Sequence, residues 1–173
     1  DINSTKPVNS NKQLIIVITA DRGLCGGFNS NTFKFVQSYI DKSAKQTELI
    51  IYGKKAYQFF KKKDIDIKAF YENIGDFINT QSVTKIAQEL LDLYESKSYS
   101  SVVVLYNEFK SAVSTNLISK QLLPLVWDRQ EERDLDSNIL IEPSIEDVLE
   151  KLIFMFLTKT MFNAFWESSA AEH

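Results

Sequence analysis

The chain has 173 residues, 44% of them hydrophobic, with a formal net charge of −3 from 20 basic and 23 acidic side chains. This length and composition suit one domain with one sizeable core. The charge balance gives no general reason to expect nucleic-acid binding. The single cysteine, Cys25, excludes an internal disulfide, and together with the single histidine, His173, it supplies too few ligands for a structural zinc site.

The apolar segments are too short to cross a bilayer. The longest uninterrupted one covers residues 152–157, whereas a membrane-spanning helix needs about 20 apolar residues. We therefore expect no direct membrane insertion. Residues 1–12 are polar, which is unlike a signal peptide, and we expect residues 1–13 to be a linker.

The pattern after this linker alternates between strands and helices. Residues 14–19 predict a strand buried on both faces, and residues 29–31 are expected to cap a helix with apolar positions from residue 33. A second strand is predicted at residues 49–52, and a short helix at residues 54–63 follows it.

The next elements complete a sheet. Residues 65–69 alternate apolar and charged side chains, which indicates a strand toward an edge. An apolar stripe from residue 80 predicts a long amphipathic helix, and residues 101–106 predict a central strand. Residues 115–123 are expected to return as its antiparallel neighbour, because the connection is too short for a parallel crossover.

This order of elements predicts an α/β fold with a doubly wound, mostly parallel five-stranded sheet and one antiparallel edge strand. The first and fourth strands are expected to be neighbours at the topological switch point. We place an α/β domain of the Rossmann-like type at residues 14–127, a charged loop and a further segment at residues 128–142, and the beginning of a long C-terminal helix at residues 143–173.

The last helix is apolar around nearly its whole circumference. Such a helix must be covered on several sides, so another element or subunit is expected beside it. The side chains expected to pack in this way are Val148, Leu149, Leu152, Ile153, Phe156, Met161 and Phe165.

A glycine turn joins the first strand to the first helix, at the place where α/β folds often bind phosphates. Gly23, Gly26 and Gly27 have the spacing G-x-x-G-G, which differs from G-x-G-x-x-G, and no Lys-Ser/Thr pair follows as in a P-loop. We favour a structural turn, because glycine permits positive φ and close strand–helix approach. A small nucleotide- or phosphate-binding enzyme is the alternative.

Other candidates for chemistry are weak. Asp21, Asn107 and Glu108 follow strands and have oxygen ligands suited to Mg²⁺, but such residues more often cap turns, so we expect no metal and no cofactor. Cys25 has no evident base to activate it, because His173 lies at the chain end. We expect no catalytic residue.

Four segments carry a resemblance to a known family. They are A-D-R-G-L-C-G-G-F-N-S-N at 20–31, Y-N-E-F-K-S-A-V-S at 106–114, K-Q-L-L-P at 120–124 and E-S-S-A-A-E-H at 167–173. In this order and spacing they resemble the gamma subunit of the rotary F-type ATP synthase, over residues 14–173. The resemblance implies an α/β body between an N-terminal helix and a long C-terminal helix, which together form a coiled-coil shaft. The N-terminal helix and most of the C-terminal helix are missing from this chain.

The resemblance implies a central-stalk rotor subunit of a proton-transporting ATP synthase, without an active site of its own. It would couple rotation of a membrane ring to ATP synthesis or hydrolysis on other subunits. The implied partners are the catalytic-ring alpha and beta subunits, an epsilon-type subunit and the membrane rotor ring. The implied location is peripheral, on the cytoplasmic side of a bacterial cell membrane or the matrix side of the mitochondrial inner membrane. The foot of the stalk would include Ile139, Leu140, Ile141, Glu142 and Glu146.

Overall fold

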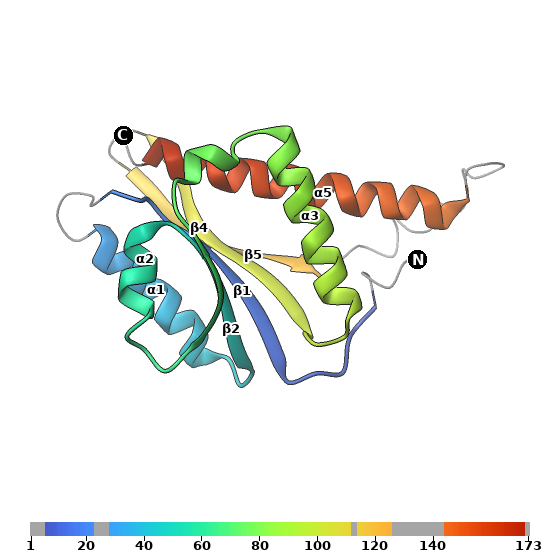
Figure 1. The fold of residues 1–173 in the computed structure, drawn as a ribbon, viewed down its shortest axis with the longest axis horizontal. Coiled ribbons are helices and arrows are strands. Elements are labelled where there is room, and N and C mark those ends of the chain that lie inside the picture. The colour runs from blue at the N-terminus through green and yellow to red at the C-terminus, as the bar shows by residue number, and fades with distance from the viewer. Residues whose placement is uncertain (1–5, 23–27, 112–113, 126–143, 172–173) are drawn as a thin grey trace.

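The structure, a computed structural model, describes residues 6–22, 28–111, 114–125 and 144–171. The strands are β1 (Lys12–Ile18), β2 (Gln46–Tyr52), β3 (Asp66–Tyr71), β4 (Ser101–Ser111) and β5 (Ser114–Leu123). The helices are α1 (Phe28–Lys42), α2 (Lys54–Phe60), the 3₁₀ helix η2 (Ile74–Phe77), α3 (Thr80–Glu95) and α5 (Ile145–Ala171). Figure 1 shows their arrangement.

The described strands form one sheet in the order β3-β2-β1-β4-β5. β1 pairs in parallel with both β2 and β4, and β2 pairs in parallel with β3. β4 and β5 form the antiparallel pair. The predicted fold class is therefore confirmed, including the adjacency of the first and fourth strands and the edge position of β3.

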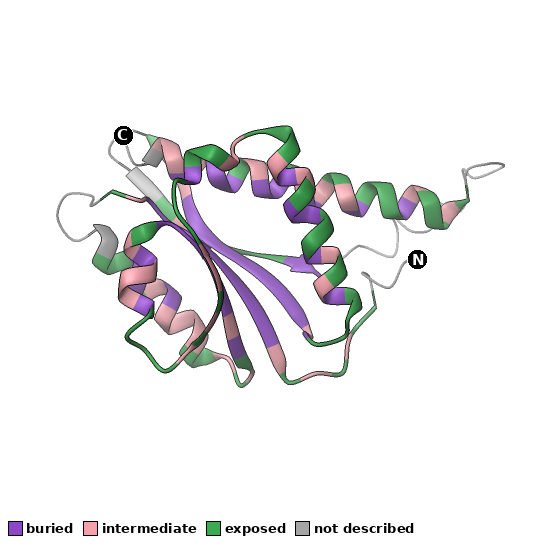
Figure 2. Ribbon diagram, viewed as in Figure 1, coloured by how far each residue is buried: buried purple, intermediate pink, exposed green. Residues whose placement is uncertain are grey.

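Helices cover both faces of the sheet, because the parallel strands carry apolar side chains on both sides (Figure 1). Ile15 and Val17 of β1 point into a core shared with α1 and α2. Leu14, Ile16 and Ile18 point into a larger core shared with α3 and α5. Figure 2 shows the strands of the sheet buried almost throughout between these layers.

Local signals account for two of the helix starts. The Asn79 side chain accepts a hydrogen bond from the Ser82 backbone N–H at 2.8 Å, which caps α3. The Ser144 hydroxyl accepts from the Asp147 N–H at 3.3 Å, which caps α5. Glu146 and Asp147 lie in the first turn of α5, where the helix dipole favours acidic groups.

Several element ends differ from the sequence-based expectation. α1 begins at Phe28, so residues 29–31 lie inside its first turn rather than before it. First-turn residues donate no intrahelical hydrogen bond, which leaves the start of a helix weakly marked in a periodic pattern. β4 continues to Ser111, past the predicted end at residue 106, because its ladder with β5 continues through the pairs Asn107–Leu117 and Glu108–Asn116.

Candidate functional site: the carboxyl edge of the sheet and helix α5

Asp21, just after β1, ties three connections together at the carboxyl edge of the sheet. Its Oδ1 accepts hydrogen bonds from the backbone N–H groups of Lys54 at 3.2 Å and Asn73 at 3.1 Å. Its Oδ2 accepts from the Ile74 N–H at 2.9 Å. These donors are the first residue of α2, the residue that precedes η2 and the first residue of η2. The carboxylate therefore acts as a shared cap for segments far apart in sequence.

Gly53 continues the same edge between β2 and α2. Its N–H donates to the Tyr71 carbonyl at 2.9 Å, and its φ is 119°, which favours glycine. A Cβ placed there would lie 2.3 Å from the Thr19 carbonyl oxygen. A glycine is therefore required here by close backbone approach. No spacing motif in the sequence marks Gly53 as required at this position.

The three residues considered as Mg²⁺ ligands do not assemble into a site. Asp21 uses both carboxylate oxygens on backbone N–H groups, and Glu108 pairs with Lys110. Asn107 is 3% exposed, and its Oδ1 has no hydrogen-bond partner. Among the described residues no group of three or more His, Cys, Asp or Glu side chains is arranged to hold a metal ion.

Three predicted positions of the turn, Gly23, Gly26 and Gly27, lie outside the described residues, as do Cys25 and His173. The same holds for Ile139, Leu140, Ile141 and Glu142 of the expected foot segment. Glu146 is described and is exposed in the first turn of α5. The predicted roles of the turn glycines and of the foot segment, including Glu146, therefore stay predictions.

Phe165 anchors α5 to the body of the molecule through aromatic contacts. Its ring packs edge-to-face on Tyr52 of β2, at 4.9 Å between centroids, and stacks with Phe77 of η2 at 5.4 Å. Tyr71 of β3 stacks on Tyr52 at 4.9 Å. Such aromatic pairs add about 0.5–1.5 kcal/mol each beyond the area they bury.

The buried stripe of α5 lies on the chain's own core. Leu149, Ile153, Met161 and Phe165 are each no more than 5% exposed, and the last three belong to the cluster formed by the sheet and α3. Ile153, Met161 and Phe165 therefore pack on the side of α5 that the chain's own domain covers, and the expected packing of this helix against another helix stays a prediction. Their spacing of three to four residues follows the turn of a helix lying on a sheet.

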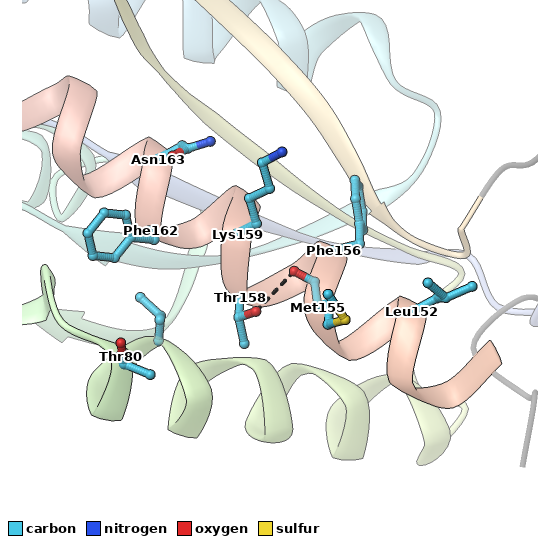
Figure 3. A pocket seen from close by; sticks show the side chains of 9 residues that line it. Thr80, Leu152, Met155, Phe156, Thr158, Lys159, Phe162 and Asn163 are labelled. Carbon is cyan, nitrogen blue, oxygen red and sulfur yellow. Dashed lines mark hydrogen bonds between the residues drawn. The ribbon is translucent and has the colours of Figure 1, made fainter. Parts of the chain in front are cut away.

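The opposite side of α5 remains accessible in the described structure. Met155 is 63% exposed, Trp166 58% and Leu152 39%, while Val148 and Phe156 are half-buried. Beside these residues lies an open groove of about 510 Å³ between the start of α3 and α5 (Figure 3). It is lined by Thr80, Val83, Leu152, Met155, Phe156, Thr158, Lys159, Phe162 and Asn163. This apolar face is the main candidate surface for a partner.

A polar group lies where the last turns of α5 meet β4. Tyr106 is buried, and this burial, followed by the charges of Glu167 and Glu108, raises its pKa to about 12. Burial and the nearby Glu108 carboxylate raise the pKa of Glu167, against the opposing effects of Lys120, Tyr106 and Lys110. Tyr106 and Glu167 were part of the motifs quoted above, but nothing in one-dimensional spacing indicated that they meet.

No helix in the described part of the chain is both long enough and apolar enough to cross a bilayer.

Comparison with known proteins adds independent information. A family model described as "ATP synthase" matches residues 2–173. The ATP synthase gamma chain of Geotalea uraniireducens is 36% identical over 165 residues, which cover 94% of this chain and 57% of that protein. The ATP synthase gamma chain of Chlorobaculum parvum is 34% identical over 168 residues, covering 94% of this chain and 58% of that protein. The chain thus spans less than two thirds of these relatives.

Solved structures share the fold. A chain from the central stalk and c-ring structure of the Tetrahymena thermophila mitochondrial ATP synthase matches with a TM-score of 0.73 and 24% identity, covering 97% of this chain and 73% of that chain. A chain from the Euglena gracilis mitochondrial ATP synthase matches with a TM-score of 0.58 and 18% identity, covering 94% of this chain and 57% of that one. The family model covers nearly the whole sequence, and the chain belongs to the ATP synthase family, where its curated relatives are gamma chains.

Proposed function

We propose that this chain is the globular body of a central-stalk rotor subunit in a proton-transporting ATP synthase. Its role is to hold the base of the shaft while ion-driven rotation of a membrane ring is coupled to ATP synthesis or hydrolysis on other subunits. The family membership and the naming of the curated relatives as gamma chains support this role. The chain itself has a mechanical function and carries no catalytic residue in this proposal.

The observation that carries the proposal is the accessible apolar face of α5. Leu152, Met155 and Trp166 are exposed on one helix of an otherwise well-buried α/β domain. Exposed apolar patches on soluble domains commonly mark interaction surfaces. A second helix of the rotor subunit, packed against this face, would bury these side chains and complete the shaft.

The proposed partners are the alpha and beta subunits of the catalytic ring, an epsilon-type subunit and the membrane rotor ring. The proposed foot that contacts the last two consists of Ile139, Leu140, Ile141, Glu142 and Glu146. The proposed location is peripheral, on the cytoplasmic side of a bacterial cell membrane or the matrix side of the mitochondrial inner membrane. A peripheral position in a membrane-bound complex is supported by the central-stalk structure that shares the fold.

The decisive experiment assembles the full-length protein with the proposed catalytic-ring and membrane-ring subunits in sealed vesicles and compares ATP hydrolysis with ATP-driven ion transport. The double variant Leu152→Ser/Met155→Ser replaces two exposed apolar side chains by polar ones. It should weaken assembly or lower the number of ions transported per ATP hydrolysed. Asp64→Asn, a change at an exposed position of the loop before β3 and outside this apolar face, is the control. Normal assembly and transport in the double variant would contradict the proposed surface.

The alternative, a nucleotide-binding enzyme, has a direct test. A ligand present at about 100 times its dissociation constant stabilises a binder by roughly 2.7 kcal/mol. The proposal predicts no change in the melting temperature of this chain with ATP and Mg²⁺. A clear upward shift would favour a nucleotide site and contradict a purely mechanical role.

A further inference from the structure

The segment before β1 is attached to the C-terminal end of α3. The Tyr94 hydroxyl donates a hydrogen bond to the backbone carbonyl of Lys6 at 2.6 Å, and Tyr94 itself is 1% exposed. Val8 is partly buried and packs against the larger core. Figure 1 shows this segment, in dark blue, passing beside the end of α3 that leads to β4. We call residues 6–10 the N-terminal strap.

The other end of the strap is held by the connection between α3 and β4. The Ser10 hydroxyl donates to the Ser98 carbonyl at 2.8 Å and accepts from the Lys12 N–H at 3.2 Å. The Lys12 carbonyl in turn accepts from the Ser100 N–H at 2.7 Å. The strap is therefore attached at both ends to residues that lie 88 positions later in the sequence.

Between its two ends the strap is not packed closely on the helix. A hollow of about 330 Å³ lies between residues 6–9 and the last turn of α3, where Tyr94, Glu95 and Lys97 line it. Because side chains do not fill this space, the hold on Lys6 depends on the Tyr94 hydroxyl, helped by the apolar contact of Val8. Opening the strap would take the acceptor away from this hydroxyl.

The opposite end of α3 lies at the aromatic contacts of α5. Phe77 stacks with Phe165 at 5.4 Å and ends η2, just before Thr80 begins α3. Tyr94 lies in the last turn of the same helix. The 16 residues of α3 correspond to about 24 Å. The attachment of α5 and that of the strap are therefore separated by about the length of this helix.

We propose that the N-terminal strap is a second mounting point of the rotor body, at which the Tyr94 hydroxyl fastens the Lys6 carbonyl to α3. Phe165 fastens α5 at the other end of the same helix. Tyr94 is a positioning residue. The inference rests on the rotor function proposed above, in which a second shaft helix connects to the body through the strap. Two separated attachments resist a twisting load better than one, because a body held at one point can pivot about it.

The first experiment measures hydrogen exchange of the Ser10 amide, which donates to the Val8 carbonyl at 3.0 Å within the strap. Tyr94→Phe removes the hydroxyl and keeps the ring, so this exchange should become about fivefold faster, as expected for the loss of one hydrogen bond. Val8→Ser removes the apolar contact and should cause a comparable rise. Asn9→Ser, a change at the exposed neighbour, should leave the rate unchanged.

Two controls separate opening of the strap from general destabilisation. Tyr71→Phe removes a hydroxyl from an exposed tyrosine and should not change Ser10 exchange. Asp21→Asn weakens the opposite edge of the sheet, so it should speed exchange in the core of β1 and leave Ser10 unchanged. Equal Ser10 exchange in the Tyr94→Phe and Tyr71→Phe variants would overturn the anchoring role of Tyr94. A Ser10 rate that rises as much in Asp21→Asn as in Tyr94→Phe would also overturn it, because the strap would then open only with the whole domain.

The second experiment uses the full-length protein assembled with the catalytic-ring and membrane-ring subunits in sealed vesicles. Val8→Ser combined with Tyr94→Phe should retain ATP hydrolysis and lower the number of ions transported per ATP. Asn9→Ser combined with Tyr71→Phe is the matched control and should leave this ratio unchanged. If the strap variant opens the strap but transports normally, the mounting role is overturned and the rotor function stands. If the unaltered protein itself supports no ATP-driven transport, the rotor function is overturned instead.

Discussion

The two halves of helix α5 contact the rest of the molecule in different ways. Residues 157–171 are fixed by a buried apolar stripe and by the ring of Phe165 among aromatic side chains. Residues 145–156 bury Leu149 and Ile153 and leave much of their remaining surface accessible (Figure 2). Both halves are rich in apolar residues, so composition alone does not distinguish an anchored segment from one with a free face.

The strongest test removes the aromatic anchor of the second half. Phe165→Ala should lower the free energy of unfolding by about 3–5 kcal/mol, because the fully buried ring contacts Tyr52 and Phe77. For a domain of this size the melting temperature should fall by about 10 °C. Urea denaturation and calorimetry measure the change.

Met155→Ala in the first half is the matched comparison. Met155 is 63% exposed, so this change should alter the free energy of unfolding by no more than about 0.5 kcal/mol. Similar losses in the two variants would show that the halves are held alike.

The next test acts on the second half from a distance. Asp21→Asn replaces one carboxylate oxygen by an amide donor, which leaves either the Ile74 N–H or both the Lys54 and Asn73 N–H groups without their acceptor. We expect a loss of about 1–3 kcal/mol. Because Ile74 begins η2, whose Phe77 stacks with Phe165, the losses from Asp21→Asn and Phe165→Ala should be less than additive.

Asp64→Asn removes an exposed carboxylate from the loop before β3 and serves as the control. It should have little effect on the denaturation midpoint. A normal midpoint in the Asp21→Asn variant would contradict the structural role of the shared cap.

A smaller effect should appear in the pH dependence of stability. Burial and then Glu108 raise the pKa of Glu167 in the folded chain, so the folded state binds this proton more readily than the unfolded state. The unfavourable contribution of the charged group is present above the folded pKa and is relieved as the pH falls through it. Stability of the parent chain relative to Glu167→Gln should therefore rise as the pH falls from 7 towards the ordinary pKa of glutamate. A constant difference across this range would contradict the raised pKa.

The smallest expected change in stability concerns the first half. Leu152→Ser on the accessible face should shift the free energy of unfolding of the chain by about 0.5 kcal/mol or less. The same change should weaken binding to an added rotor helix, measured by titration calorimetry. A large loss of stability in the isolated chain would show that this face is already satisfied within the chain.

Much of the fold could be predicted from the sequence because periodicity reports local geometry. The buried run of β1 and the apolar stripe of α3 marked their elements directly, and the short link before β5 required an antiparallel pair. The predicted start of α1 and the predicted end of β4 were wrong, because polar residues near these ends carry little periodic signal. Backbone hydrogen bonding continues both elements beyond the apolar pattern.

The site was harder to predict because its contacts join distant segments. Asp21 was considered as a metal ligand or a turn cap, but its bonds to Asn73 and Ile74 depend on the packing of β3 beside β2. Gly53 belongs to no sequence motif. A side chain is excluded there because the backbone of Thr19, the residue after β1, lies too close. The apolar circumference of α5 was visible, but which face the sheet covers was not.

The length of α5 has a mechanical consequence. Its 27 residues correspond to about 40 Å of helix, and its first twelve to about 18 Å. A sideways load applied at residue 145 would therefore act on the aromatic seat of Phe165 through a lever arm of about 30 Å. The buried side chains along α5, from Leu149 to the rings of Tyr52 and Phe77 around Phe165, would together resist such a load.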